Sequence, residues 1–450
     1  MFELYFDHLV TVLQSQRAML SGNLLFVQWR AERSDFVRFN HGQLRQAGTV
    51  ERHGADLRLI QGKKVALLQL ALTGNTDDDA ALVKDALREL LAGIADAPED
   101  PHLLVNTAAS ESTDSESSTL VEPHVLVQAV QQEAEGHDLV GAYMGGPMAC
   151  GLWSSLGARH YFERCQWSLD SSLYARSDAT HQRRDKAVKA TLSGDVFSRE
   201  TVRASIQDSL LKLEVLYRTP KVLAPGSYRA LLAPAALAEL VEMMCWGGFS
   251  ARSQLTGQSP LAKLRAGEVQ LSSLMNLGED LRQIPAPRFQ ADGFVRPIAT
   301  ELIRAGRAAD WFCSPRTGRE FGIEPNGASN DEGPAALSMQ GGSLLAADEL
   351  SALGTGLAIS NLWYLNFSDR SNARVTGMTR FASFWVEDGQ WVAPIVPMRF
   401  DDSLFNLLGS ELQALGVEPA RLPNLSSYDW RSSSATLAPS ALIRAMRFTL

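Results

Sequence analysis

The chain has 450 residues, of which 45% are hydrophobic and 21% are charged, ordinary values for a globular protein of two or three domains. Its formal net charge of −9 argues against a nucleic-acid-binding protein, which needs a basic face to displace counterions. The four cysteines are spaced too widely for a CxxC metal or redox motif and are too few for a disulfide framework.

The first ten residues carry Glu3 and Asp7, where a secretory signal needs basic residues. No apolar run approaches the roughly 18–20 residues that span a bilayer. We therefore expect a cytoplasmic protein that contacts neither membrane nor nucleic acid.

Residues 3–20 place apolar side chains at helical spacing and predict an amphipathic helix. Alternation of apolar and polar residues then predicts short antiparallel strands joined by turns, at 24–31, 35–40, 43–51, 55–60 and 65–72. Asn75 and the acidic residues after it predict a capped helix that ends near residue 95. The polar, serine-rich stretch 96–119 predicts a loop.

A helix is expected at 122–135, and another at 198–216, where Ser198 opens the helix. Strands are expected between them, at 137–146, 149–155 and 160–175. Basic residues crowd the segment after the last strand and predict an exposed loop, formed by Arg176, Arg183, Arg184, Lys186 and Lys189.

The second half opens with a predicted strand at 228–234 and a helix at 235–246, which Gly247 and Gly248 end. Long ordered loops are expected over 250–345, and strands follow from residue 354, including a hairpin turned at 387–390. The predicted class is α+β. An N-terminal α/β domain over 1–220 would have a mostly antiparallel sheet and the loop 96–119. A β-rich, barrel- or sandwich-like domain would cover 221–450.

All eight histidines lie at or before position 181. The second half therefore lacks the commonest metal ligand and the usual general base. Glu239 and Glu242, three residues apart on one helix face, are a candidate carboxylate pair for acid–base chemistry or simply a solvated face. Cys245 and Cys313 are candidate nucleophiles, although buried structural thiols are the better interpretation.

Arginines alternate with tryptophans on the last predicted strands, at Arg374, Arg380 and Arg399 and at Trp363, Trp385 and Trp391. Such a surface could hold the carboxylates or backbone of a peptide, and an open strand edge could pair with it. The alternative is a twisted sheet whose aromatic rings pack inward and whose arginines are solvated.

Three segments carry a resemblance to a known family: GTGL at 354–357, TGMTRFASFWVEDGQ at 376–390 and VAPIVPMRFDDSLFNLLG at 392–409. They resemble the TldD/PmbA family, whose second type of subunit is called PmbA or TldE. Upstream, the segments 169–189, 198–216 and 219–241 also fit the family's pattern. The resemblance covers nearly the whole chain and is strongest over 354–409.

The family implies an N-terminal α/β domain, a β-rich C-terminal domain and dimers that enclose a cavity. TldD-type subunits carry HExxxH, in which two imidazoles bind zinc, the glutamate activates water and a distant cysteine completes the site. Here Glu239 stands at the glutamate position, whereas Ala238 and Met243 stand at the histidine positions. The C-terminal stretch also has no cysteine.

The resemblance thus implies a PmbA/TldE-type subunit with no zinc or other cofactor of its own. It would work beside a TldD-type protease subunit in a heterodimer, or form a homodimer, and help to bind and present extended, unfolded peptides. Arg374, Arg380 and Trp385 are the residues we expect to face the peptide. The alternatives are an independent metal-free hydrolase with a carboxylate site around Glu239 and Glu242, and a pure protein-interaction protein with the gyrase-modulating role attached to the family's older name.

Overall fold

Helices account for 26% and strands for 41% of the chain, and most strands pair antiparallel, so the predicted α+β class is confirmed. The computed structural model describes residues 2–116, 118, 120, 122–175 and 186–449. Of the helices in these residues, none is long and apolar enough to cross a membrane.

The alternating residues near the N-terminus form a long antiparallel ribbon of three strands: β1 (Leu24–Asn40), β2 (Gln43–Gln61) and β3 (Lys64–Leu72). The prediction of two short strands in place of β1, and two in place of β2, was wrong. Glu32 and Ser34, which fall between the two predicted strands, lie buried inside β1. They are tolerated there because both have partners: Arg52 Nε donates to Glu32 Oε1 at 2.8 Å, and Arg431 Nη1 donates to Ser34 Oγ at 2.8 Å.

Four more strands complete this sheet: β4 (Ser110–Glu116), β5 (Asp138–Ser154), β6 (Ala158–Tyr174) and β7 (Ala187–Gly194). The strand order is β3-β2-β1-β5-β6-β4, and β7 also pairs with β6. The prediction of a loop throughout 96–119 was wrong, because β4 pairs in parallel with β6. Its polar side chains find partners on β6: Arg164 Nη2 donates to Asp114 Oδ1 at 2.6 Å, for example.

His160 on β6 is the most enclosed of these partners of β4. Its two ring nitrogens form hydrogen bonds with the hydroxyls of Ser110, at 2.9 Å, and Ser112, at 2.7 Å, and the ring stacks on Phe289. Burial lowers the pKa of His160 below its usual value of 6.5. The neutral imidazole therefore holds the polar strand in place.

We expect the pairing of β4 with β6 to weaken in acid. The unfolded chain binds a proton at His160 near pH 6.5, whereas the folded chain binds it only at lower pH, so this contribution to stability is lost as the pH falls below about 6.5. Urea unfolding at pH 7.5 and pH 5 should show a loss of about 1 kcal/mol that is absent in His160→Gln. Replacement of the exposed His124 by glutamine should leave the loss in place; an equal effect of both variants would contradict this assignment.

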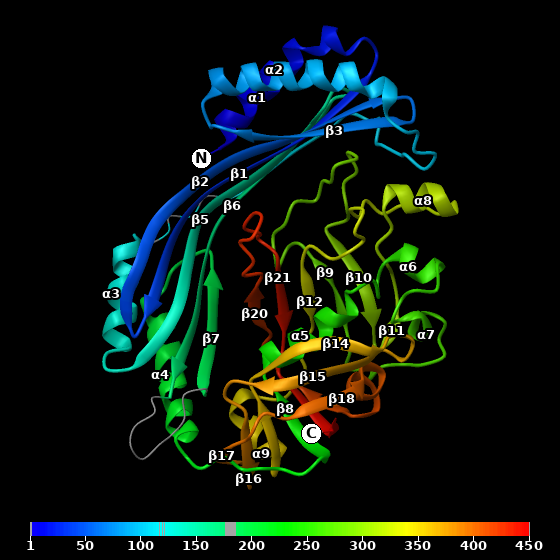
Figure 1. Ribbon diagram of the computed structural model, residues 1–450. Helices are drawn as coiled ribbons and strands as arrows, with labels where there is room; N and C mark the ends of the chain where they lie inside the picture. The colour runs from blue at the N-terminus through cyan, green and yellow to red at the C-terminus, as the bar shows by residue number, and fades with distance from the viewer. Residues whose placement is uncertain (1, 117, 119, 121, 176–185, 450) are drawn as a thin grey trace.

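Four helices cover one face of the first sheet. α1 (Glu3–Ser15) and α2 (Thr76–Gly93) pack at one end, and α3 (Pro123–Glu133) and α4 (Arg199–Leu216) at the other (Figure 1). The predicted caps are confirmed: the side chain of Asn75 accepts from the backbone N–H groups of Asp77 and Asp78, and that of Ser198 from Thr201.

The second half contains two further sheets. Nine strands form one of them, in the order β14-β15-β18-β22-β8-β13-β16-β17 with β19 beside β22. Their bounds are β8 (Gly226–Leu232), β13 (Gly356–Ile359), β14 (Asn361–Asp369), β15 (Arg374–Arg380), β16 (Phe384–Glu387), β17 (Gln390–Pro394), β18 (Arg399–Ser403), β19 (Leu412–Leu415) and β22 (Ala441–Phe448). The predicted hairpin joins β16 to β17, and Asp388 and Gly389 both adopt positive φ, as a tight hairpin turn requires.

The other sheet has six strands in the order β11-β10-β9-β12-β21-β20. They are β9 (Leu277–Asp280), β10 (Ala299–Arg304), β11 (Arg307–Ala308), β12 (Leu337–Met339), β20 (Ala420–Pro423) and β21 (Ala435–Ala438). The expected loops of 250–345 thus also contain short strands, together with the short helices α6 (Ala251–Leu255), α7 (Ala262–Arg265) and α8 (Pro315–Phe321); α9 (Glu349–Leu353) follows.

One helix, α5 (Pro234–Met244), shares a large apolar core with both of these sheets. Within residues 186–449 no closed barrel is found. The division predicted at residue 220 falls between the last strand of the first sheet and the first strand of the others, and independent domains on either side of it stay a prediction.

The segment between β20 and β21 inserts between the first sheet and the second half (Figure 1). Within this segment, the Arg431 guanidinium donates to Ser34 Oγ on β1, to the Gly146 carbonyl on β5 at 3.4 Å and to the Gln166 carbonyl on β6 at 2.8 Å. The neighbouring Trp430 ring lies 4.7 Å from the Arg52 guanidinium. The Arg431 side chain therefore links three strands of the first sheet to the segment between β20 and β21.

Candidate functional site

The sequence of helix α5 determines where the helix begins and ends and which of its faces is buried. Pro234 occupies the first turn, where its missing N–H costs nothing, and Gly247, with a φ of 80°, follows the end of the helix. Leucines and other apolar residues at helical spacing enter the core. The fully buried ones are Leu237, Leu240, Val241 and Met244. This packing leaves Glu239 and Glu242 on the faces that the core does not cover.

Ala238 and Met243, which the resemblance equates with the two histidines of HExxxH, are each only 3% exposed. Neither side chain has an atom that binds zinc well, and both pack against protein. Among the residues that the structure describes, no group of three His, Cys, Asp or Glu side chains could hold a metal ion. The expectation that this chain has no cofactor of its own stays a prediction.

Glu239 lies close enough to Arg380, at the end of β15, and to Lys189, on β7, for their charges to act on it. Burial, followed by the nearby charge of Glu242, raises its pKa to about 8, while Arg380 and Lys189 act in the opposite direction. The Glu239 carboxyl group is therefore mostly protonated at pH 7.

Glu242 lines a different region, a cleft of about 510 Å³ at the ends of β12, β20 and β21. The Thr436 hydroxyl donates to Glu242 Oε1 at 2.8 Å. Burial raises the pKa of Glu242, and the bond from Thr436 lowers it. The side chain nevertheless reaches solvent through the cleft. The two glutamates thus have different surroundings, and a shared carboxylate site stays a prediction.

Arg380, at the end of β15, is held by aromatic rings. Its guanidinium carbon lies 3.7 Å from the ring centre of Trp363 and 4.8 Å from that of Phe381. Phe381 adopts a φ of 56°, which is unusual for a bulky residue and turns the chain sharply after the strand. Within the described parts of the chain, no hydrogen bond or ion pair engages the guanidinium of Arg380, so it is available to an anionic group.

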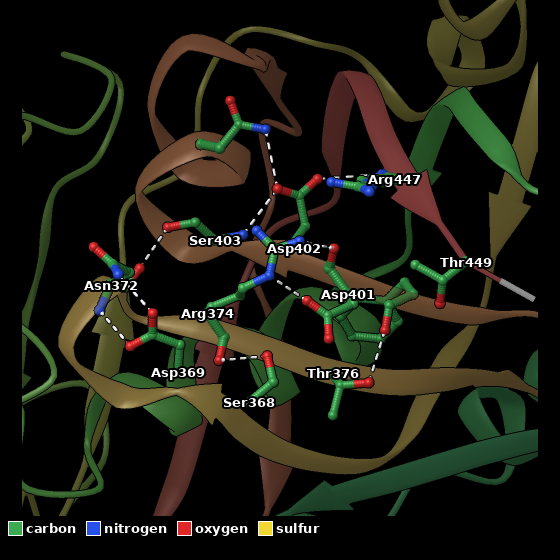
Figure 2. Close-up of polar contacts among 12 residues, drawn as sticks. Ser368, Asp369, Asn372, Arg374, Thr376, Asp401, Asp402, Ser403, Arg447 and Thr449 are labelled. Atoms are coloured by element: carbon green, nitrogen blue, oxygen red, sulfur yellow. Dashed lines mark hydrogen bonds and ion pairs between the residues drawn. The ribbon is translucent and has the colours of Figure 1, made fainter.

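Arg374 and Trp385, the other two residues expected to face a peptide, already have partners. Figure 2 shows Arg374 paired with Asp401 on the neighbouring β18; its Nη2 also donates to the Asp401 carbonyl at 3.1 Å. Trp385 Nε1 donates to Glu387 at 2.6 Å, and Lys221 lies 4.5 Å over its ring. In the sheet, β18, β22, β8 and β13 separate β15 from β16. Arg374 and Trp385 are thus engaged with neighbouring side chains, and the role of the three residues stays a prediction.

Two further predictions meet different outcomes. The exposed basic loop is wrong for Lys186, which is buried and donates to the Ile395 carbonyl at 3.0 Å, and for Lys189, which pairs with Asp170 on β6 at 2.7 Å. Arg176, Arg183 and Arg184 lie outside the described residues.

The two cysteines named as candidate nucleophiles have raised pKa values. Burial raises the pKa of the Cys313 thiol to about 12, and burial also raises the pKa of the Cys245 thiol. Both shifts favour structural thiols over nucleophiles.

The cleft itself was not predicted from the sequence. Its walls come from α5, from the start of β12, from the end of β20 and from the start of β21. These segments are up to roughly 200 residues apart in the chain. Only the placement of Glu242 on an exposed helix face was visible beforehand.

The comparisons agree with this architecture. The family model described as the PmbA/TldA metallopeptidase C-terminal domain matches residues 225–450, half of the chain. The chain therefore belongs to the PmbA/TldD family. No match was found among curated proteins.

Solved structures resemble the chain over nearly its full length. TldE from Thermococcus kodakarensis superposes with a TM-score of 0.79 at 14% identity, covering 98% of this chain and 100% of that one. A proposed modulator of a DNA gyrase from Thermotoga maritima gives 0.76 at 14% identity, with 100% of both chains covered. A proposed modulator of DNA gyrase from Bacteroides thetaiotaomicron gives 0.73 at 15% identity, with 98% of both covered. At these identities the likeness establishes the fold.

Proposed function

We propose that this protein is a non-catalytic, PmbA/TldE-like subunit of a cytoplasmic TldD/TldE-type metalloprotease and helps to bind and present unfolded peptides. Membership of a metallopeptidase family supports a role in proteolysis, and the full-length likeness to a TldE supports that type of subunit. Zinc would belong to a TldD-type partner, where it would polarise the water that attacks the peptide bond.

The observation that carries this proposal is the state of helix α5. The resemblance places Ala238 and Met243 at the two positions of the family's zinc-binding histidines, and both side chains are buried in the core. Any peptide hydrolysis by the complex would then depend on the partner's site. This chain's contribution would be to bind and orient the peptide.

Two features, the edge strand β14 and the side chain of Arg380, suit this protein to hold an extended peptide. β14 lies at one end of the nine-stranded order, and Trp363 and Tyr364 on it are 51% and 77% exposed. An edge strand can pair with an added strand, and exposed aromatic rings can contact its side chains. Arg380, stacked on Trp363, could bind an acidic group of the same peptide.

One observation favours a second candidate function. Glu239 has a pKa of about 8 and lies close enough to Glu242 to be affected by its charge. Two carboxyl groups in different surroundings are what acid–base hydrolysis without a metal uses. The gyrase-modulating role, suggested by the names of two structural neighbours, is supported by no separate feature of this surface.

The purified chain should contain no stoichiometric zinc and should not cleave casein or short peptides. Addition of a TldD-type subunit should produce cleavage, and Arg380→Ala should reduce the rate of the complex about tenfold if the guanidinium anchors the peptide. Elemental analysis and a peptidase assay measure this. Tightly bound zinc in this chain alone would overturn the proposal, and turnover without a partner, abolished in Glu239→Gln, would establish the metal-free hydrolase.

A further inference from the structure

The cleft beside α5 contains a single charged side chain. Apart from Glu242 it is lined by uncharged residues: Cys245, Trp246, Pro334, Ala335, Ala336, Leu337, Leu422, Pro423, Asn424, Leu425, Ser434, Ala435 and Thr436. Its volume of about 510 Å³ lies within the range of sites that take small molecules or a few peptide side chains, about 300–1,000 Å³. Figure 1 shows α5 beside β12, β20 and β21, the strands whose ends form its rim.

The Glu242 carboxylate is only partly satisfied. Oε1 accepts the Thr436 hydroxyl at 2.8 Å, and among the described residues no donor reaches Oε2. Pairing with lysine or arginine is also absent within that part of the chain. Because Glu242 is exposed to the cleft and its Oε2 is open, the cleft favours a positively charged ligand by charge complementarity.

A neighbouring side chain strengthens this preference. Trp246 lines the cleft and is 53% exposed, which leaves its indole face able to contact a cation or an aliphatic chain. Glu239, the other acidic residue of the helix, does not line the cleft. The cleft therefore presents the single carboxyl group of Glu242, which suits a single ammonium group.

We propose that this cleft binds a primary ammonium group of a peptide, with its nitrogen on Glu242 and its aliphatic part against Trp246, Leu337 and Leu422. The ammonium group can be a lysine side chain or a free N-terminus, because both present the same three N–H donors. The choice of a peptide as ligand rests on the proposed function. The site adds a preference for basic or N-terminal segments to the presentation of unfolded chains.

The test uses the purified full-length chain and fluorescein-labelled peptides of one sequence in three forms. One has a lysine and an acetylated N-terminus, one has acetyl-lysine and a free N-terminus, and one has both amines acetylated. Fluorescence anisotropy should show binding of at least one of the first two forms at least about tenfold tighter than the third. The form that binds identifies the source of the ammonium group.

Glu242→Gln should abolish this preference and leave the affinity for the fully acetylated peptide unchanged. Glu239→Gln is the matched control, because Glu239 lies three residues away on the same helix but outside the cleft lining, and it should keep the preference. Glu242→Lys should favour a peptide with glutamate in place of lysine. Should Glu242→Gln be unstable, the charge-reversed variant still decides the question.

Equal binding of all three peptides, or an equal loss in Glu239→Gln, would overturn this assignment. The experiment needs no partner subunit and no proteolysis. Failure here with partner-dependent cleavage intact would reject only the ammonium site, whereas loss of partner-dependent cleavage would reject the proposed function.

Discussion

Arg431→Ala should lower the free energy of unfolding by about 2–4 kcal/mol, one of the two largest effects we expect from a single substitution. The guanidinium donates to three strands of the first sheet, through Ser34, Gly146 and Gln166. Burial lowers the pKa of Arg431 from its usual value, and Glu32 opposes that shift, so the group is both desolvated and compensated. Removal of the arginine leaves these acceptors without their donor.

Urea unfolding followed by circular dichroism measures this loss, and hydrogen exchange over residues 424–434 should show the segment opening first. Arg444→Ala is the control, because Arg444 is an exposed arginine in the same C-terminal region and should change stability by less than about 0.5 kcal/mol. Equal effects of the two variants would show that the Arg431 contacts contribute little.

Glu239→Gln should stabilise the protein at alkaline pH and leave it unchanged in acid. The pKa of Glu239 is about 8 in the folded chain and about 4.5 when unfolded. Because the folded pKa is the higher one, the folded state is unpenalised below pH 4.5 and loses stability as the pH rises toward 8. Glutamine cannot ionise, so its advantage at pH 9 should reach about 2 kcal/mol, a value reduced for partial solvent exposure.

Denaturant titrations of both proteins at pH 4.5, 7 and 9 test this prediction. The difference between them should grow steadily across the series. Glu89→Gln, at an exposed position on α2, should show no such growth. A difference that is already complete at pH 4.5 would indicate a packing effect of the substitution rather than the ionisation of Glu239.

Local sequence signals were reliable where a structure depends on its own residues. Asn75 and Ser198 cap the helices that they were expected to cap, and Asp388 and Gly389 turn the expected hairpin. Helix α5 was likewise evident from its apolar residues and the glycines after it, although its first residue, Pro234, was predicted to end the preceding strand. Each depends on contacts within a few residues, which the sequence states directly.

Predictions failed where distant residues supply the partners. β4 is too polar to suggest a strand, yet His160, Arg159 and Arg164 on β6 satisfy its side chains. The buried Glu32 likewise accepts hydrogen bonds from Arg52 and from the backbone N–H of Arg431, which is 399 residues away in the chain. Polarity was interpreted as exposure, because the sequence does not show which groups will meet.

The same distinction between local and long-range contacts applies to the candidate site. The sequence alone established that no histidine follows position 181, and the resemblance implies that Ala238, Glu239 and Met243 stand at the family's HExxxH positions on α5. Only the tertiary structure decided that Glu239 lies near Arg380 and Lys189 while Glu242 lines a cleft that Glu239 does not. Residue types are written in the chain, but the surroundings that set a carboxyl group's charge and its ligand come from strands brought together by long-range packing.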